Sequence, residues 1–130
     1  MQTKTRIQLS PFINFQGRAR EAMEFYRKVL GGTLELPPAG SGERIAQARL
    51  EADGVLIIGT DGHPDYPATV GDNMALSIGG TEKERLTRIF SALAEGGKVQ
   101  MPLARQPWGT EVGWLRDKFG VPWTISIEEE

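Results

Sequence analysis

Apolar side chains recur with helical spacing in residues 19–30. Four of them occupy positions i, i+3, i+4 and i+7 of one stripe: Ala22, Phe25, Tyr26 and Val29. Charged residues occupy the positions between them, as expected when one face of a helix packs against a core. Gly31 and Gly32 follow directly, and glycine suits the left-handed backbone conformation at a helix C-terminus. The pattern predicts an amphipathic helix that ends at the double glycine.

The same design returns in the second half of the chain. Its stripe has the same spacing: Leu86, Ile89, Phe90 and Leu93. Thr81 and Glu84 have the spacing of a capping box, so we expect them at the start of this helix. A second double glycine begins at Gly96, which lies 65 positions after Gly31. The offset predicts that one structural unit occurs twice.

Strand candidates flank each helix in the same order. In the first half they are residues 7–15, 33–36, 44–50 and 55–60, and in the second half residues 74–78, 98–101, 111–116 and 123–127. A tight turn at Asp53-Gly54 joins the last two candidates of the first half, and residues 118–120 take the corresponding place in the second. Each half is therefore predicted as strand, helix and three strands.

These elements predict an α+β fold built from tandem βαβββ modules. We expect a single domain over residues 1–130, with repeat 1 at 1–65, repeat 2 at 66–130 and a linker at 61–72. A lone module leaves one face of its sheet uncovered. Two modules can therefore curl into a mostly antiparallel sheet around a cavity.

Composition narrows the classes of function. Lys and Arg number 15 and Asp and Glu 17, so the net charge is −2 and we expect no nucleic-acid partner. The absence of cysteine excludes disulfides, zinc–thiolate sites and cysteine nucleophiles. The chain has neither an apolar stretch typical of a signal peptide nor one long enough for a membrane span. We therefore expect a cytoplasmic protein without a membrane partner.

Three strings carry a family resemblance: FINFQGRAREAMEFYRKVLGG at 12–32, GDNMALSI at 71–78 and MPLARQPWGTEVGWLRDKFGVPW at 101–123. They resemble the vicinal oxygen chelate superfamily, which includes glyoxalase I, extradiol dioxygenases and bleomycin-resistance proteins. They are most similar to its PhnB-like, demethylubiquinone methyltransferase-like branch. The resemblance implies a curled sheet around a ligand cavity and a homodimer. No glycine-rich nucleotide loop supports the methyltransferase label.

Enzymes of this superfamily hold a divalent metal between strands, which polarises substrate oxygens. The corresponding positions fall near Ser10, Ile57, Asn73 and Thr124. The side chains at these positions are uncharged and provide weak metal ligands or none. A divalent cation prefers carboxylate or imidazole ligands. The sequence therefore predicts that the usual metal site is absent and that no cofactor is resident.

A second metal candidate is local. Asp61, His63 and Asp65 surround the only histidine of the chain and could supply two carboxylates and an imidazole. The alternative interpretation is a polar turn, because Asp-Gly and His-Pro are loop dipeptides. His63 is also the candidate catalytic residue, since imidazole exchanges protons near neutral pH.

Strand alternation supplies the candidate ligand contacts. On residues 44–50, Gln47 and Arg49 share the face of Ile45, and the opposite face of small and apolar residues is expected beneath the helix. Gln47 and Arg49 would then face the cavity, or alternatively water. Three further candidates are Asn14 on the first strand, Trp108 in a Pro-Trp-Gly loop and Trp123 on the last strand. The alternative for Asn14 is that it faces water, for Trp108 that it forms a dimer contact, and for Trp123 that it lies in the core.

Two functions remain open at this stage. One is a metal-free protein that binds a small organic ligand, and the missing metal ligands favour it. The other is a metal-dependent glyoxalase- or dioxygenase-like enzyme that uses a non-standard site.

Overall fold

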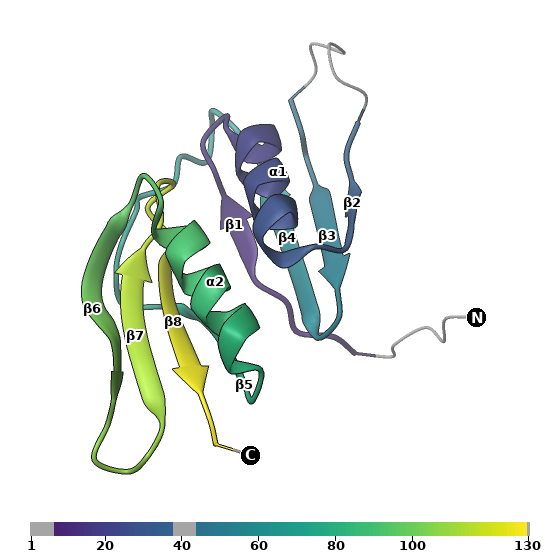
Figure 1. Ribbon diagram of the computed structural model, residues 1–130. Coiled ribbons are helices and arrows are strands. Elements are labelled where there is room, and N and C mark those ends of the chain that lie inside the picture. The colour runs from purple at the N-terminus through teal and green to yellow at the C-terminus, as the bar shows by residue number, and fades with distance from the viewer. Residues whose placement is uncertain (1–6, 38–43, 130) are drawn as a thin grey trace. The chain divides into compact units, whose positions relative to one another are not determined.

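The computed structural model describes residues 7–37 and 44–129, and Figure 1 shows its elements. The first half contains β1 (Phe12–Asn14), α1 (Ala19–Leu30), β2 (Thr33–Glu35), β3 (Ala48–Ala52) and β4 (Val55–Thr60). The second half contains β5 (Leu76–Gly80), α2 (Lys83–Ala94), β6 (Lys98–Arg105), β7 (Glu111–Arg116) and β8 (Pro122–Ile127). Each half thus runs strand, helix, strand, strand, strand, as the repeat predicts.

The two sheets have the same topology. Their strand orders are β1-β4-β3-β2 and β5-β8-β7-β6. In each, the first strand pairs in parallel with the last, and the other neighbours are antiparallel. The α+β fold with two βαβββ modules is therefore confirmed.

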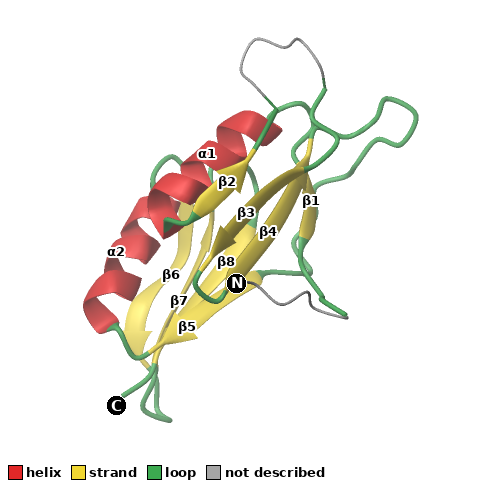
Figure 2. Cartoon of the chain, turned by 90° about the vertical axis from the view of Figure 1, so that its right-hand side faces the viewer, coloured by secondary structure: helices red, strands yellow, loops and turns green. Residues whose placement is uncertain are grey.

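Each helix lies on one face of the sheet of its own module (Figure 2). In the first module Met23 and Tyr26 of α1 are fully buried, together with Leu50 of β3. In the second, Leu93 of α2 is fully buried, together with Leu115 of β7. The predicted stripe of α2 is thus buried throughout, whereas in the predicted stripe of α1 Ala22 and Tyr26 are buried and Phe25 and Val29 half-buried. Gly31, at φ 79°, ends α1 as expected.

Contacts between Cα atoms divide the described residues into two compact units. The first takes residues 7–27, 31–37 and 44–68, and the second takes 28–30 and 69–129. The division falls inside the predicted linker. The repeat boundary at 65/66, the single domain and the cavity between modules stay predictions.

The first predicted strand, residues 7–15, is too long. Pairing with β4 is confined to Phe12–Asn14, and the side chains of Ile7 and Leu9 are 90% and 99% exposed. Pro11 precedes β1, and its carbonyl accepts a hydrogen bond from the Ile58 N–H at 3.0 Å. Proline has no N–H to return, so regular pairing begins only at Phe12.

The strand predicted at 44–50 begins later, at Ala48, because the residues before it do not pair with a neighbouring strand. Ile45 directs its backbone N–H and C=O to Asp61 instead of a neighbouring strand, and its side chain is buried. Ile45 is therefore a core residue that precedes the ladder of β3. Ala48 and Leu50 do lie on the buried face, as predicted.

The capping box at Thr81 is also wrong. The N-cap of α2 is Glu82, and no side chain caps this helix. The Thr81 carbonyl instead accepts a hydrogen bond from the Lys83 N–H at 2.9 Å. A turn therefore occupies the place where the sequence pattern predicts the cap.

Three strands of the second module also differ from their predicted bounds. β8 starts one residue early, at Pro122, and β5 ends at Gly80 rather than residue 78. β5 starts at Leu76 rather than residue 74, because its ladder with β8 starts there, and Met74 is 79% exposed. β6 continues to Arg105 through part of a predicted loop. Its pairing with β7 shifts register twice, and it is an edge strand, where Pro102 is tolerated.

Neither helix of the described segments reaches the length and hydropathy that a bilayer crossing requires.

Candidate functional site

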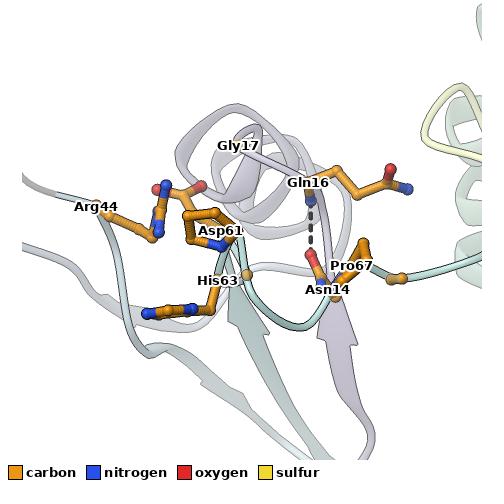
Figure 3. A pocket seen from close by; sticks show the side chains of 10 residues that line it. Asn14, Gln16, Gly17, Arg44, Asp61, His63 and Pro67 are labelled. Carbon is orange, nitrogen blue, oxygen red and sulfur yellow. Dashed lines mark hydrogen bonds between the residues drawn. The ribbon is translucent and has the colours of Figure 1, made fainter.

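A pocket of about 260 Å³ lies in the first unit, where β1 and β4 end and α1 begins (Figure 3). We call it the α1 pocket. Its lining comes from the β1–α1 connection, the segment before β3 and the segment after β4: Asn14, Gln16, Gly17, Arg44, Asp61, Gly62, His63, Pro64, Pro67 and Ala68. Three predicted candidates, Asn14, Asp61 and His63, are thus brought together.

Asp61 organises the walls of the α1 pocket. Its Oδ1 accepts a hydrogen bond from the Ala19 N–H of α1 at 2.9 Å, and its Oδ2 accepts one from the Ile45 N–H at 2.7 Å. Its own N–H donates to the Ile45 carbonyl at 2.9 Å, and its carbonyl accepts from the Gly17 N–H at 3.0 Å. A carboxylate at the start of a helix is also stabilised by the helix dipole. Asp61 thereby ties three chain segments together.

Asp61 also fixes the backbone position of Arg44, because it holds the backbone of the next residue, Ile45. Arg44 directly precedes Ile45, whose N–H and C=O both bond Asp61 and whose side chain is buried. The Thr60 hydroxyl adds a donor to the same Ile45 carbonyl at 3.3 Å. The Arg44 guanidinium itself makes no ion pair or hydrogen bond with the described residues. The pocket therefore has an anchored backbone that carries a cation without a partner among residues 7–37 and 44–129.

Asn14 forms the opposite wall in the view of Figure 3. Its Oδ1 accepts a hydrogen bond from the Gln16 N–H at 2.8 Å, which supports the left-handed backbone of Gln16 at φ 52°. Gly62 lies against the carboxamide, because a Cβ there would be 2.6 Å from Asn14 Oδ1. The Nδ2 group of Asn14 has no hydrogen-bond partner in the described part of the chain. It is a donor left available at the pocket wall.

His63 lies on a turn after Asp61. Its Nδ1 accepts a hydrogen bond from the Asp65 N–H at 3.1 Å and lies 3.7 Å from Asp65 Oδ2. The neutral ring therefore carries its hydrogen on Nε2, and the protonated ring carries one there as well. Its side chain is 56% exposed, and its ring centroid lies 5.6 Å from that of Tyr66. His63 consequently offers an Nε2–H donor to the pocket.

The local metal candidate does not fit a cation site. Both carboxylate oxygens of Asp61 already accept backbone N–H groups, and Asp65 does not line the pocket. Over residues 7–37 and 44–129, no three His, Asp or Glu side chains converge as a metal would require. The polar-turn interpretation describes the geometry of Asp61, His63 and Asp65 better.

The four positions implied by the superfamily do not fit a divalent ion either. Ile57 is aliphatic and buried, and Thr124 is a half-buried hydroxyl on β8. Ser10 precedes β1, and Asn73 is exposed outside any strand. None supplies a charge or an imidazole.

The other predicted ligand contacts are not part of the lining of the α1 pocket. Arg49 points to the face of β3 opposite α1 and pairs with Glu51 at 3.3 Å. Gln47 is exposed before β3. Trp108 is 71% exposed in the β6–β7 turn, whereas Trp123 is only 3% exposed. Their ligand roles stay predictions, and none of these four residues lines this pocket.

The string DKFGVPW builds a turn. Asp117 is 3% exposed, and its Oδ1 accepts hydrogen bonds from the Phe119 and Val121 N–H groups at 2.9 and 3.0 Å. Its Oδ2 accepts one from Trp123 Nε1 at 2.9 Å. The Arg116 guanidinium donates to the Gly120 carbonyl at 2.8 Å. The most distinctive string of the sequence therefore stabilises the β7–β8 connection.

Arg44 is the site residue that sequence reasoning missed. The predicted strand at 44–50 includes it only as its first residue, and the sequence pattern assigns no role to it. The signal that could have found it is Asp61-Gly62 directly after β4, since an acidic residue beside a helix start is a ready backbone acceptor. Only the fold determines which backbone N–H groups donate their hydrogen bonds to Asp61.

The two sheets and their pairing define the glyoxalase-like class of α+β fold. A glyoxalase/bleomycin resistance protein from Albidiferax ferrireducens shares this fold, with a TM-score of 0.63 and 20% identity over 92% of this chain and 96% of that one. Such a likeness concerns the fold alone.

The family is shown by the sequence itself. The family model described as 3-demethylubiquinone-9 3-methyltransferase matches residues 7–126, so the chain belongs to this family, the PhnB-like branch of the vicinal oxygen chelate superfamily. The chain is 36% identical to PA1353 of Pseudomonas aeruginosa, with a TM-score of 0.84 and 95% and 99% of the two chains covered. It is 26% identical to the PhnB protein of Bacillus cereus, with a TM-score of 0.75 and 93% and 99% covered.

Proposed function

We propose that this PhnB-like protein binds a small organic molecule in the α1 pocket, without the metal site usual in its superfamily. The observation that carries the proposal is the pocket itself, whose walls are joined by the four hydrogen bonds of Asp61. A site that is already organised loses little conformational entropy when a ligand binds.

The composition of the lining supports the same proposal. Pro64, Pro67 and Ala68 supply apolar surface, while Asn14, Arg44 and His63 supply polar groups. Small-molecule sites combine apolar walls with a few placed polar groups. Pockets for drug-sized ligands typically measure roughly 300 to 1,000 Å³. The α1 pocket, at about 260 Å³, lies just below this range, so it suits a smaller ligand with one ring or a short chain.

Ligand-observed NMR on the full chain tests this proposal with benzoate, phenyl phosphate and benzamide as probes. We expect Ala68→Phe to remove binding, because the new ring would fill the space beside a half-buried pocket residue. Thr69→Phe is the matched control, since the adjacent residue is exposed and does not line the pocket. Binding that Ala68→Phe leaves unchanged, or no binding of any probe, would refute the proposal.

The alternative function is a metal-dependent glyoxalase- or dioxygenase-like enzyme. Such an enzyme would need metal ligands other than the residues at the four superfamily positions and other than Asp61, His63 and Asp65. Calorimetric titration with zinc, nickel and manganese separates it from the metal-free proposal.

A further inference from the structure

We infer that the α1 pocket selects ligands that carry an oxyanion, a carboxylate or a phosphate ester, through Arg44 and His63. This inference rests on the proposed function and adds the class of ligand. Its basis is a contrast within the lining: the acceptors of Asp61, Asn14 and His63 are engaged, whereas the donors of Arg44, His63 and Asn14 have no partner in the described part of the chain.

The side-chain acceptors of Asp61, Asn14 and His63 in the α1 pocket already have partners, whereas the Gln16 carboxamide brings one acceptor and one donor group to the lining. Both carboxylate oxygens of Asp61 accept backbone N–H groups, and Asn14 Oδ1 accepts the Gln16 N–H. His63 Nδ1 accepts the Asp65 N–H. A ligand rich in hydrogen-bond donors would have to displace one of these bonds or bind the Gln16 carboxamide.

The donors in the α1 pocket are not used. The Arg44 guanidinium, the Nε2–H group of His63 and the Nδ2 group of Asn14 have no partner among residues 7–37 and 44–129. Figure 3 shows Arg44 and His63 on one side of the pocket and Asn14 on the other. Guanidinium presents a planar fork of N–H groups that matches carboxylate and phosphate oxygens.

The acidic residues nearby do not cancel this preference. The charge of Asp61 is stabilised by two N–H donors and by the positive end of α1. Asp65 lies 3.7 Å from His63, but its side chain is 79% exposed, so water and salt screen its charge. Arg44 is therefore the charge of the lining that has no hydrogen-bond or ion-pair partner within the described segments.

Calorimetric titration of the full chain compares benzoate and phenyl phosphate with the uncharged benzamide. We expect both anions to bind more tightly than benzamide, and the tighter of the two to identify carboxylate or phosphate as the preferred group. Arg44→Gln should weaken anion binding about 10-fold to 100-fold, the range for a charge-assisted hydrogen bond, and leave benzamide unaffected. Arg88→Gln is the matched control, because Arg88 is an exposed arginine of α2 outside the pocket.

A pair of His63 variants tests the second donor. His63→Asn retains an acceptor near the position of Nδ1 for the Asp65 N–H but removes Nε2–H, and it should weaken anion binding about 2-fold to 10-fold. His63→Gln restores a donor near Nε2 and should recover part of the affinity.

Two results would overturn the inference. Equal affinities for benzoate, phenyl phosphate and benzamide, or an Arg44→Gln variant that binds anions like Arg88→Gln, would refute it while leaving the proposed function intact. The absence of any binding that depends on Ala68 would refute the proposed function and this inference together.

Discussion

Replacing Asp117 with asparagine should destabilise the protein strongly, although the change removes only one charge. Asp117 is 3% exposed and accepts two backbone N–H groups on Oδ1 and the Trp123 Nε1–H on Oδ2. Asparagine keeps one oxygen for the backbone groups. Its Nδ2 donor would then face the Trp123 donor, which leaves both without an acceptor.

The magnitude follows from these three bonds. A hydrogen bond to a charged group contributes about 1.5–3 kcal/mol, and an unsatisfied buried donor costs about 1–3 kcal/mol. Losing the Trp123 bond and weakening two others should lower the free energy of unfolding by about 3 kcal/mol. With an m-value of about 2 kcal/mol/M in urea, the midpoint should shift by about 1.5 M.

The assay is urea denaturation followed by circular dichroism, with Trp123→Phe and the double variant included. Because Trp123→Phe removes the donor that asparagine would oppose, the double variant should be more stable than the sum of the single effects predicts, by about 1–3 kcal/mol. Asp72→Asn is the control: its side chain is 82% exposed and 3.9 Å from Arg116, so its effect should stay within about 0.5 kcal/mol. A loss below 0.5 kcal/mol for Asp117→Asn, or strict additivity in the cycle, would refute the reasoning.

Two further predictions concern metal binding and assembly. In calorimetric titrations with zinc, nickel and manganese, we expect neither wild type nor His63→Ala to bind tightly, because Asp61 uses both carboxylate oxygens on backbone N–H groups. If wild type binds a metal tightly and His63→Ala does not, the local site at Asp61, His63 and Asp65 is a metal site after all. If both bind tightly, other residues hold the metal, and the proposal of a protein that works without a metal is wrong. In light scattering at micromolar concentration we expect a homodimer, as the superfamily resemblance implies and as exposed sheet edges favour; a monomer mass would contradict this.

Local patterns in the sequence predicted the helices and several of the strands well. β4 and β7 begin and end where alternation and turns place them, and the apolar stripe of each helix is buried or half-buried. These features depend on the periods of 3.6 and 2 residues and on glycine at turns. Neighbours along the chain decide them, so they can be read without knowing the fold.

The sequence also determined the fold class, because the helix pattern and its double glycine occur twice. It did not determine where strands begin. β1 is short because Pro11 cannot donate to β4, and β3 starts late because Ile45 bonds Asp61. Both bounds depend on partners that are distant along the chain.

The α1 pocket was decided by tertiary structure alone. Arg44 precedes Asp61 by 17 positions and follows Asn14 by 30, and no local pattern relates the three residues. The parallel pairing of β1 with β4 brings the ends of these strands together, and the hydrogen bonds of Asp61 add the segment before β3. The residue types, and hence the chemistry available, were present in the sequence. Their convergence required the hydrogen bonds between segments that only the folded chain can form.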